Sequence, residues 1–340
     1  MSPDKRRMRP MGIADILDET VELYKTSFVL LVGIAAVMNV PYAIMERYFL
    51  VPRMMSLTTA ASTRNGPSPA DLIVLLGAML IAYGYLLVTA PIVTGALTYA
   101  ISERYLDRKV TIIGSFRRVF SASIFGQLLL AIIIKALVLV APMLLVVAAL
   151  FLVGVTASSL GSAGLVIIIL IALPLALATG CAAIYVLLRL ALVETTIVVE
   201  GRGIGHALSR TWTLMRANML KCLGLYAIAW IVTAVVSIIC TNPTQTIIMT
   251  SAMRGGHISQ PMLILHTAIG AISSTVLAPV ISMVTILLYY DIRIRREGFD
   301  LELLASELDE KSRRADVWTA PPLPQEIIPQ PAPEGETGSQ

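Results

Sequence analysis

The sequence predicts an all-α, polytopic membrane protein with six transmembrane helices. Of its 340 residues, 56% are hydrophobic and 14% are charged, and the mean hydropathy is +0.80. Soluble domains carry about one quarter charged residues, so this composition indicates a membrane protein. A bilayer-spanning helix needs about 20 mostly apolar residues, and six runs of that kind, bounded by charges, lie at 27–49, 72–101, 126–153, 164–190, 219–240 and 262–290.

Lysine and arginine are distributed unevenly between the segments outside these runs. The N-terminal segment, the second and fourth connections and the C-terminal segment together hold 21 of them, whereas the other connections hold four, namely Arg47, Arg53, Arg64 and Arg254. Cytoplasmic loops of membrane proteins carry such an excess of positive charge. We therefore expect both termini to lie in the cytoplasm.

The segments that precede the odd-numbered spans resemble one another. Residues 13–28, IADILDETVELYKTSF, align without a gap on residues 204–219, IGHALSRTWTLMRANM, and a shorter copy, IIGSFRRVF, precedes the third span. Each returning span has a proline 13 to 15 residues before an exit arginine: Pro91 and Arg104, Pro174 and Arg189, Pro279 and Arg293. The sequence therefore predicts three repeats, at about 9–108, 109–200 and 201–304, each an amphipathic elbow helix followed by a transmembrane hairpin.

The prolines of the returning spans have two interpretations. A proline in a membrane helix kinks it, while neighbouring groups satisfy the carbonyl that loses its amide donor. Three equivalent kinks would also open a central cavity between the repeats. The sequence leaves both interpretations open.

The first elbow segment is amphipathic, with an acidic outer face. Helical spacing places one set of residues on a shared face and four acids on the other: Ile13, Ile16, Leu17, Thr20, Tyr24 and Phe28 against Asp15, Asp18, Glu19 and Glu22. Anionic headgroups favour basic segments, so this helix is poorly suited to them. We expect it to pack against the other two elbows, which are basic; a solvated charged face is equally compatible with the pattern.

Lys135 lies inside the third predicted span. It follows Gly126 by nine residues, which is about 14 Å along a helix. No acidic residue in another predicted span offers a partner, and the plausible polar neighbours are Asn39, Tyr83, Tyr85 and Thr179. Three roles remain open: snorkelling to the interface, contact with a substrate or lipid headgroup, and packing.

The last predicted span ends in a dense group of aromatic and charged residues. Tyr289 and Tyr290 fit an interfacial aromatic belt, and Arg293 and Arg295 follow on the predicted cytoplasmic side. Anchoring does not require the acids of the same stretch, Asp291, Glu297 and Asp300. We expect salt bridges between this exit and the basic elbows, with a binding site as the alternative.

Two stretches resemble a known family. RPMGIADILDETVELYKTSF at 9–28 and LLYYDIRIRREGFDLELL at 287–304 resemble the two ends of the glycerophosphodiester phosphodiesterase membrane-domain family and related uncharacterised bacterial six-helix inner-membrane proteins. In that family the membrane domain can precede a catalytic barrel, and the 36 residues after Leu304 do not suffice for one. The resemblance therefore implies a multi-pass protein of the bacterial cytoplasmic membrane, without the enzymatic activity.

Residues that carry chemistry are sparse. The three histidines, His206, His257 and His266, form no H-E-x-x-H motif, and no G-x-S-x-G motif is present; we expect no catalytic site, metal or cofactor. Residues 305–340 form a proline-rich stretch that we expect to be disordered and cytoplasmic.

The leading interpretation is a non-enzymatic integral membrane protein, acting as a scaffold or as a component that interacts with lipid or with another membrane protein. The alternative is a transporter or permease with a cavity between the repeats near Lys135. Expected partners are the lipid bilayer and a membrane protein or a second copy of the chain, and no nucleic acid.

Overall fold

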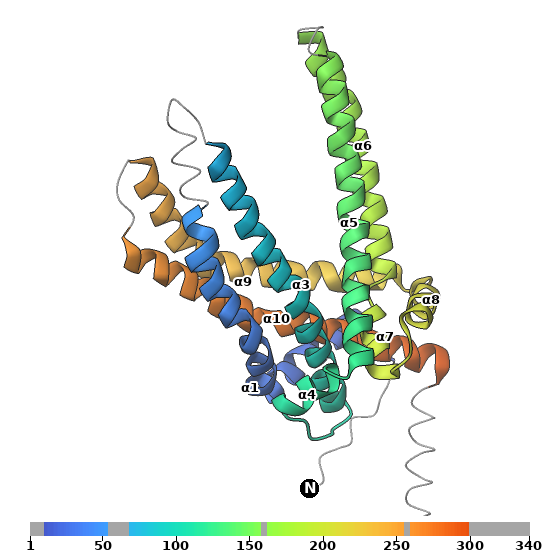
Figure 1. The fold of residues 1–340 in the computed structure, drawn as a ribbon. Helices are drawn as coiled ribbons and strands as arrows, with labels where there is room; N and C mark the ends of the chain where they lie inside the picture. The colour runs from blue at the N-terminus through green and yellow to red at the C-terminus, as the bar shows by residue number, and fades with distance from the viewer. Residues whose placement is uncertain (1–9, 54–67, 158–161, 255–258, 299–340) are drawn as a thin grey trace, which may run out of the picture.

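The computed structural model describes residues 10–53, 68–157, 162–254 and 259–298, and these form helices joined by short turns, without a strand (Figure 1). In chain order the helices are α1 (Ile13–Met45), the π-helical turn η1 (Glu46–Leu50), α3 (Pro69–Tyr105), α4 (Ile112–Val119), α5 (Ala122–Ala157), α6 (Ser162–Arg189), α7 (Val193–Glu200), α8 (Ile204–Met215), α9 (Met219–Met253) and α10 (Gln260–Glu297).

Six helical segments in the described part of the chain are long and apolar enough to cross a membrane. Four are the single helices α3, α5, α9 and α10. The other two are composite: α1 continued by η1, and α6 continued by α7. The predicted all-α class with six candidate spans is thus confirmed. The helices run beyond the apolar runs of the sequence, because charged and polar residues continue several of them for two or more turns.

A break separates each elbow from the span that follows it. α1 kinks at Ser27, where the backbone leaves the helical region (φ −120°, ψ 16°), and short turns separate α4 from α5 and α8 from α9. The buried face of the first elbow consists of Ile16, Thr20, Leu23 and Ser27. It differs from the predicted face, since the kink turns Phe28 outward and leaves it 42% exposed.

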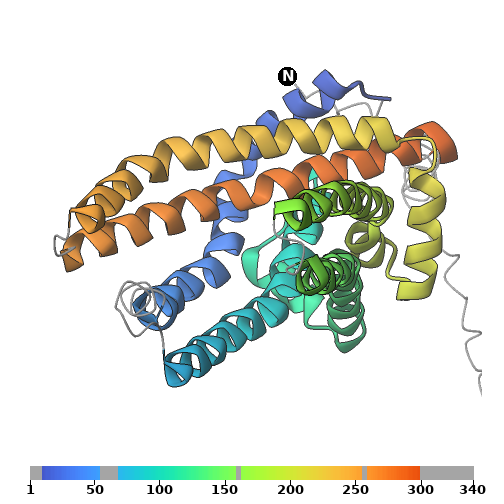
Figure 2. The ribbon, with the colours of Figure 1, turned by 90° about the horizontal axis from the view of Figure 1, so that it is seen from above.

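The core lies at one end of the molecule, which we call the base. α10 is its central element: every residue from Met283 to Ile292 is buried, and α1, α3 and α9 pack around it. Away from the base the helices diverge. α5 and α6 rise together in Figure 1, whereas α9 and α10 cross the view, and the same divergence is seen from above in Figure 2. The outer halves therefore expose apolar side chains such as Leu144 and Leu173.

The segment after α6, which we assigned to the fourth connection, is buried in the structure. It folds into α7, in which all residues from Val193 to Val198 are buried, against α3, α5 and α8. Its composition suits burial, since its two threonines stand among apolar residues and a threonine can bond its hydroxyl within the helix: Thr196 Oγ1 donates to the carbonyl of Leu192 at 2.9 Å. α7 ends at Gly201, whose φ of +65° suits glycine.

Three described residues have a positive φ: Asp107, Gly201 and Gly298. Each follows the end of a returning helical segment, namely α3, α7 and α10. They lie about 95 residues apart along the chain, the period that the sequence predicts for the repeats.

Tyrosines from other helices donate hydrogen bonds to backbone carbonyls near two helix prolines. Tyr24 Oη donates to the carbonyl of Val276 and Tyr85 Oη to that of Met38, both at 2.8 Å. Each carbonyl lies three residues before a proline, Pro279 and Pro41 respectively, next to the carbonyl that the proline leaves without its amide donor.

Candidate functional site

A buried carboxylate joins the beginning of α1 to α9 and α10. Asp291 has no solvent-exposed area. Its Oδ1 accepts hydrogen bonds from the amide of Met11 (2.7 Å) and from Nε of Arg295 (3.0 Å), and its Oδ2 accepts one from Nζ of Lys221 (2.5 Å). The two cations also donate to the carbonyl of Met11, at 2.6 and 2.8 Å. Both backbone polar groups of Met11 are thereby satisfied inside the core.

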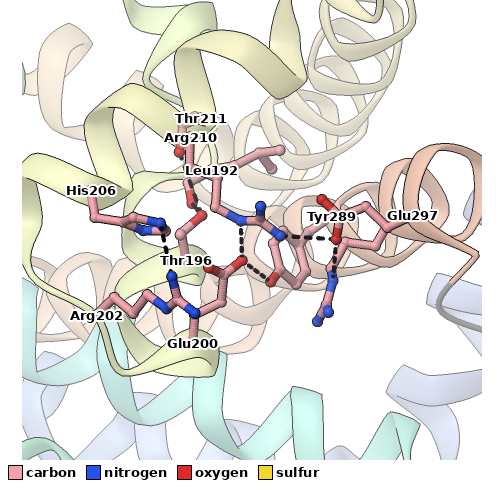
Figure 3. Close-up of polar contacts among 10 residues, drawn as sticks. Leu192, Thr196, Glu200, Arg202, His206, Arg210, Thr211, Tyr289 and Glu297 are labelled. Carbon is pink, nitrogen blue, oxygen red and sulfur yellow. Dashed lines mark hydrogen bonds and ion pairs between the residues drawn. The ribbon is translucent and has the colours of Figure 1, made fainter. Parts of the chain in front are cut away.

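A second cluster joins α7, α8 and α10 (Figure 3). Arg210 donates from Nε to Oε1 of Glu200 (2.5 Å) and from Nη2 to Oε2 of Glu297 (2.9 Å). Glu200 Oε1 also accepts a hydrogen bond from Oη of Tyr289 (2.8 Å), and Arg293 Nε donates to Glu297 Oε2 (3.1 Å). Arg210, on α8, thus bridges two acids from two other helices.

The environment of Arg210 keeps it charged. Burial alone would lower the pKa of its guanidinium, but the hydrogen bonds and charges of Glu200 and Glu297 outweigh burial and raise that pKa above its ordinary value. Arg210 therefore remains a cation at every physiological pH, and the bridge does not respond to pH through this residue.

The C-terminal end of α8 is held by two exit arginines. Arg189 Nη1 donates to the carbonyl of Trp212 (2.8 Å), and Arg296 Nη1 donates to that of Thr213 (3.2 Å). The last carbonyls of a helix have no partner within it, and cations stabilise this end of its dipole. Arg189 also lies against the rings of Trp212 and Tyr185, with centroid distances of 4.9 and 5.2 Å.

The prediction that Lys135 has no acidic partner is wrong. Its Nζ forms an ion pair with Oε2 of Glu194, a residue of α7 with 8% of its surface exposed. The prediction failed because Glu194 was assigned to a connection outside the membrane, whereas α7 places it in the core. Of the neighbours proposed for Lys135, Tyr85 donates to the carbonyl of Met38 and Thr179 to that of Leu175.

Tyr289 and Tyr290 are not the interfacial anchors that we predicted. Both are completely buried, because each hydroxyl has a partner inside the core. Tyr289 Oη donates a hydrogen bond to Oε1 of Glu200, and Tyr290 Oη forms a hydrogen bond with Oγ of Ser102 (2.6 Å). A buried tyrosine is stable when its hydroxyl is satisfied in this way.

The structure brings most of the candidate residues of the sequence into these contacts. Asp291 and Arg295 belong to the first cluster, Arg293 and Glu297 to the second, and Lys135 to a separate pair. Pro91, Pro174 and Pro279 lie within α3, α6 and α10. Asp300 lies outside the described residues, as do His257 and the stretch 305–340.

Sequence reasoning missed the two acids of α7 and the role of Lys221. Glu194 and Glu200 stand in LVETTIVVEG, an apolar stretch directly after a span. Acids in such a stretch need a buried partner, and this signal could have identified them. Lys221 was counted only as a topogenic charge, although it stands two residues inside α9.

These clusters are suited to holding helices together. Each carboxylate accepts from at least one cation, so its charge is compensated within the protein. Within the described ranges, no group of three or more histidine, cysteine or acidic side chains could hold a metal ion.

Comparisons with known proteins give a family without an assigned activity. Residues 11–292 match the model of a family described as a domain of unknown function, DUF7847. No curated protein and no solved structure matches the chain. The match covers five of the six candidate spans in full and α10 as far as Ile292, so Asp291 lies within it, whereas Arg293, Arg295 and Glu297 lie beyond its end. The chain therefore belongs to the DUF7847 family, and its helices indicate a multi-pass membrane protein.

Proposed function

We propose that this protein is a non-enzymatic scaffold of the bacterial cytoplasmic membrane, whose hairpins are tied at the base and whose outer halves contact lipid or another membrane protein. The observation that carries the proposal is that the buried charges bind other groups of the protein. The buried charged residues of the described chain, Arg189, Glu194 and Asp291, all bind other protein groups. A site that binds a charged substrate would instead offer a charge without a protein partner.

The base is proposed to face the cytoplasm and to contain three related units. The excess of lysine and arginine supports this orientation. Three times along the chain, an elbow is followed by an outgoing helix and a returning helix, and this order supports three related units. The positive φ values at Asp107, Gly201 and Gly298 also support them. Labelling of an Arg118→Cys variant from outside intact cells would overturn the orientation.

One observation favours a second candidate function, a transporter or permease. Lys135 and Glu194 form an ion pair within candidate spans, and ionisable residues in such positions often line substrate or proton pathways. Transport would require water or substrate to reach this pair. The scaffold proposal requires the pair to stay dry.

Cysteine labelling distinguishes the two functions. Lys135→Cys with Glu194→Gln, in a background with the natural cysteines Cys181, Cys222 and Cys240 replaced, is reconstituted in liposomes and treated with a membrane-impermeant maleimide. The scaffold predicts no labelling from either side. Labelling at Lys135→Cys would establish an aqueous path and favour a transporter. Arg108→Cys, 63% exposed at the base, serves as the positive control, and Leu144→Cys, exposed on the apolar outer half, as the negative control.

The resemblance to glycerophosphodiester phosphodiesterase membrane domains stays a prediction, and so does the absence of catalysis. Hydrolysis of a phospholipid or glycerophosphodiester by the purified protein, lost on substitution of Glu194 or Asp291, would overturn the non-enzymatic proposal.

A further inference from the structure

Three exposed cations lie where an elbow meets its span. They are Lys25 in α1, Arg117 in α4 and Arg216 at the end of α8. Lys25 and Arg216 are equivalent in the alignment of 13–28 on 204–219. Within the part of the chain that the structure describes, none of the three has an ion pair or a side-chain hydrogen bond, whereas neighbouring cations such as Arg210 and Lys221 are bound.

Each cation lies between two exposed apolar side chains. The first stands four residues earlier, one helical turn away on the same face of the elbow. The second stands three or four residues later, just before the span or within its first turn. We call these sets the three stripes: Val21, Lys25 and Val29; Ile113, Arg117 and Phe120; Trp212, Arg216 and Leu220. Leu220 is 84% exposed, and Val29 and Ile113 are each 80% exposed.

This combination matches a membrane interface. A helix at the interface buries apolar side chains at the headgroup and acyl boundary and presents lysine or arginine to anionic lipid. The three elbows lie toward the base in Figure 1, close to the ends of the helices that cross the membrane. Each stripe has this composition, with a cation and an apolar group on either side of it.

We propose that the stripes at Arg117 and Arg216 bind the phosphate groups of anionic phospholipids in the leaflet that adjoins the base. This inference rests on the proposed function, because it assumes that the elbows contact lipid. The helices α4 and α8 contain no acidic residue, so nothing there competes with the phosphate. Lys25 shares its elbow with Asp18 and Glu22, both exposed, and binds such lipids more weakly.

Trp212 provides a direct probe of the third stripe. A protein with Trp212 as its only tryptophan, made by Trp230→Phe and Trp318→Phe, is placed in phosphatidylcholine nanodiscs. A fixed fraction of the lipid is replaced by brominated phosphatidylglycerol or by brominated phosphatidylcholine. Brominated chains quench a tryptophan that they contact. We expect stronger quenching by the anionic lipid, and an increase in salt should reduce the difference because it screens the attraction.

Substitution of Arg216 tests the charge itself. Arg216→Gln should decrease the preference for the anionic lipid roughly fivefold, as expected for one cation near the surface, and Arg216→Lys should keep it. Arg108→Gln is the matched control, since Arg108 lies at the same end, pairs with Glu103 (3.7 Å) and is 63% exposed. An unchanged preference in Arg216→Gln, or equal quenching by the two lipids in the parent protein, would overturn the inference.

The two proposals can fail independently. Labelling of Lys135→Cys together with an intact preference for phosphatidylglycerol would refute the scaffold and leave the lipid site. A dry Lys135→Cys without a lipid preference would leave the scaffold and refute the lipid site.

Discussion

Replacing Asp291 by asparagine tests the first cluster most sharply. The carboxylate is fully buried and compensates Lys221 and Arg295 at once. Asparagine keeps the shape and one acceptor oxygen but removes the charge, so Lys221, whose side chain is 18% exposed, is left as a buried cation without an anion. Breaking a buried ion pair from one side costs about 3–5 kcal/mol. Arg295 is 45% exposed, so its share is small because solvent screens it.

The measurement is thermal unfolding in a mild detergent. For a chain of this size, 1 kcal/mol corresponds to a shift of roughly 2–4 °C or less, so we expect Asp291→Asn to lower Tm by on the order of 10 °C. The double variant Asp291→Leu with Lys221→Met removes both charges and should recover much of the loss, since an apolar pair of similar volume often replaces a buried ion pair. A Tm for Asp291→Asn within 2 °C of the parent protein would refute the reasoning.

Three further predictions concern single contacts, each measured by the same unfolding assay. Lys135→Met should be destabilising because Glu194 loses its ion-pair partner, and Lys135→Met combined with Glu194→Gln should be closer to the parent; equal Tm values for the two would contradict this. Tyr24→Phe should cost about 1 kcal/mol, because the carbonyl of Val276, three residues before Pro279, loses the hydrogen bond from the Tyr24 hydroxyl, and an unchanged Tm would show that this contact contributes no stability. Gly201→Ala should cost about 1–2 kcal/mol through its φ of +65° alone, since the nearest atom to an added Cβ lies 4.0 Å away.

The architecture could be predicted because the membrane imposes a length and a composition on each span. Hydropathy located all six candidate spans, and the spacing of apolar residues located the elbows before α5 and α9. The same rule misplaced α7. Its two acids, Glu194 and Glu200, made it look like a connection, and only their pairing with Lys135 and Arg210 makes its burial favourable.

The sequence indicated which charged residues belong to the candidate site, but it did not indicate which residues they contact. Asp291 and Glu297 stood out because anchoring alone does not require acids at a membrane exit. Their partners come from far along the chain, since Met11 is 280 residues from Asp291 and Arg210 is 87 residues from Glu297. Such pairings depend on how the hairpins meet, which residue periodicity does not encode. The burial of Tyr289 and Tyr290 was missed for the same reason: their hydroxyl partners, Glu200 and Ser102, belong to other hairpins.

The distribution of polar contacts explains why the helices converge at one end. Lipid chains are as apolar as leucine, so the hydrophobic effect does not drive membrane helices together; packing and polar contacts do. Here the ion pairs of Asp291, Glu200 and Glu297 gather at the base, while the exposed surface of the outer halves is largely apolar, with residues such as Leu144 and Leu173. The apolar surface of the outer halves suits contact with lipid and with apolar surfaces of other membrane proteins. The scaffold that we propose relies on this combination, because the base holds the hairpins together and the apolar outer halves stay available for contact.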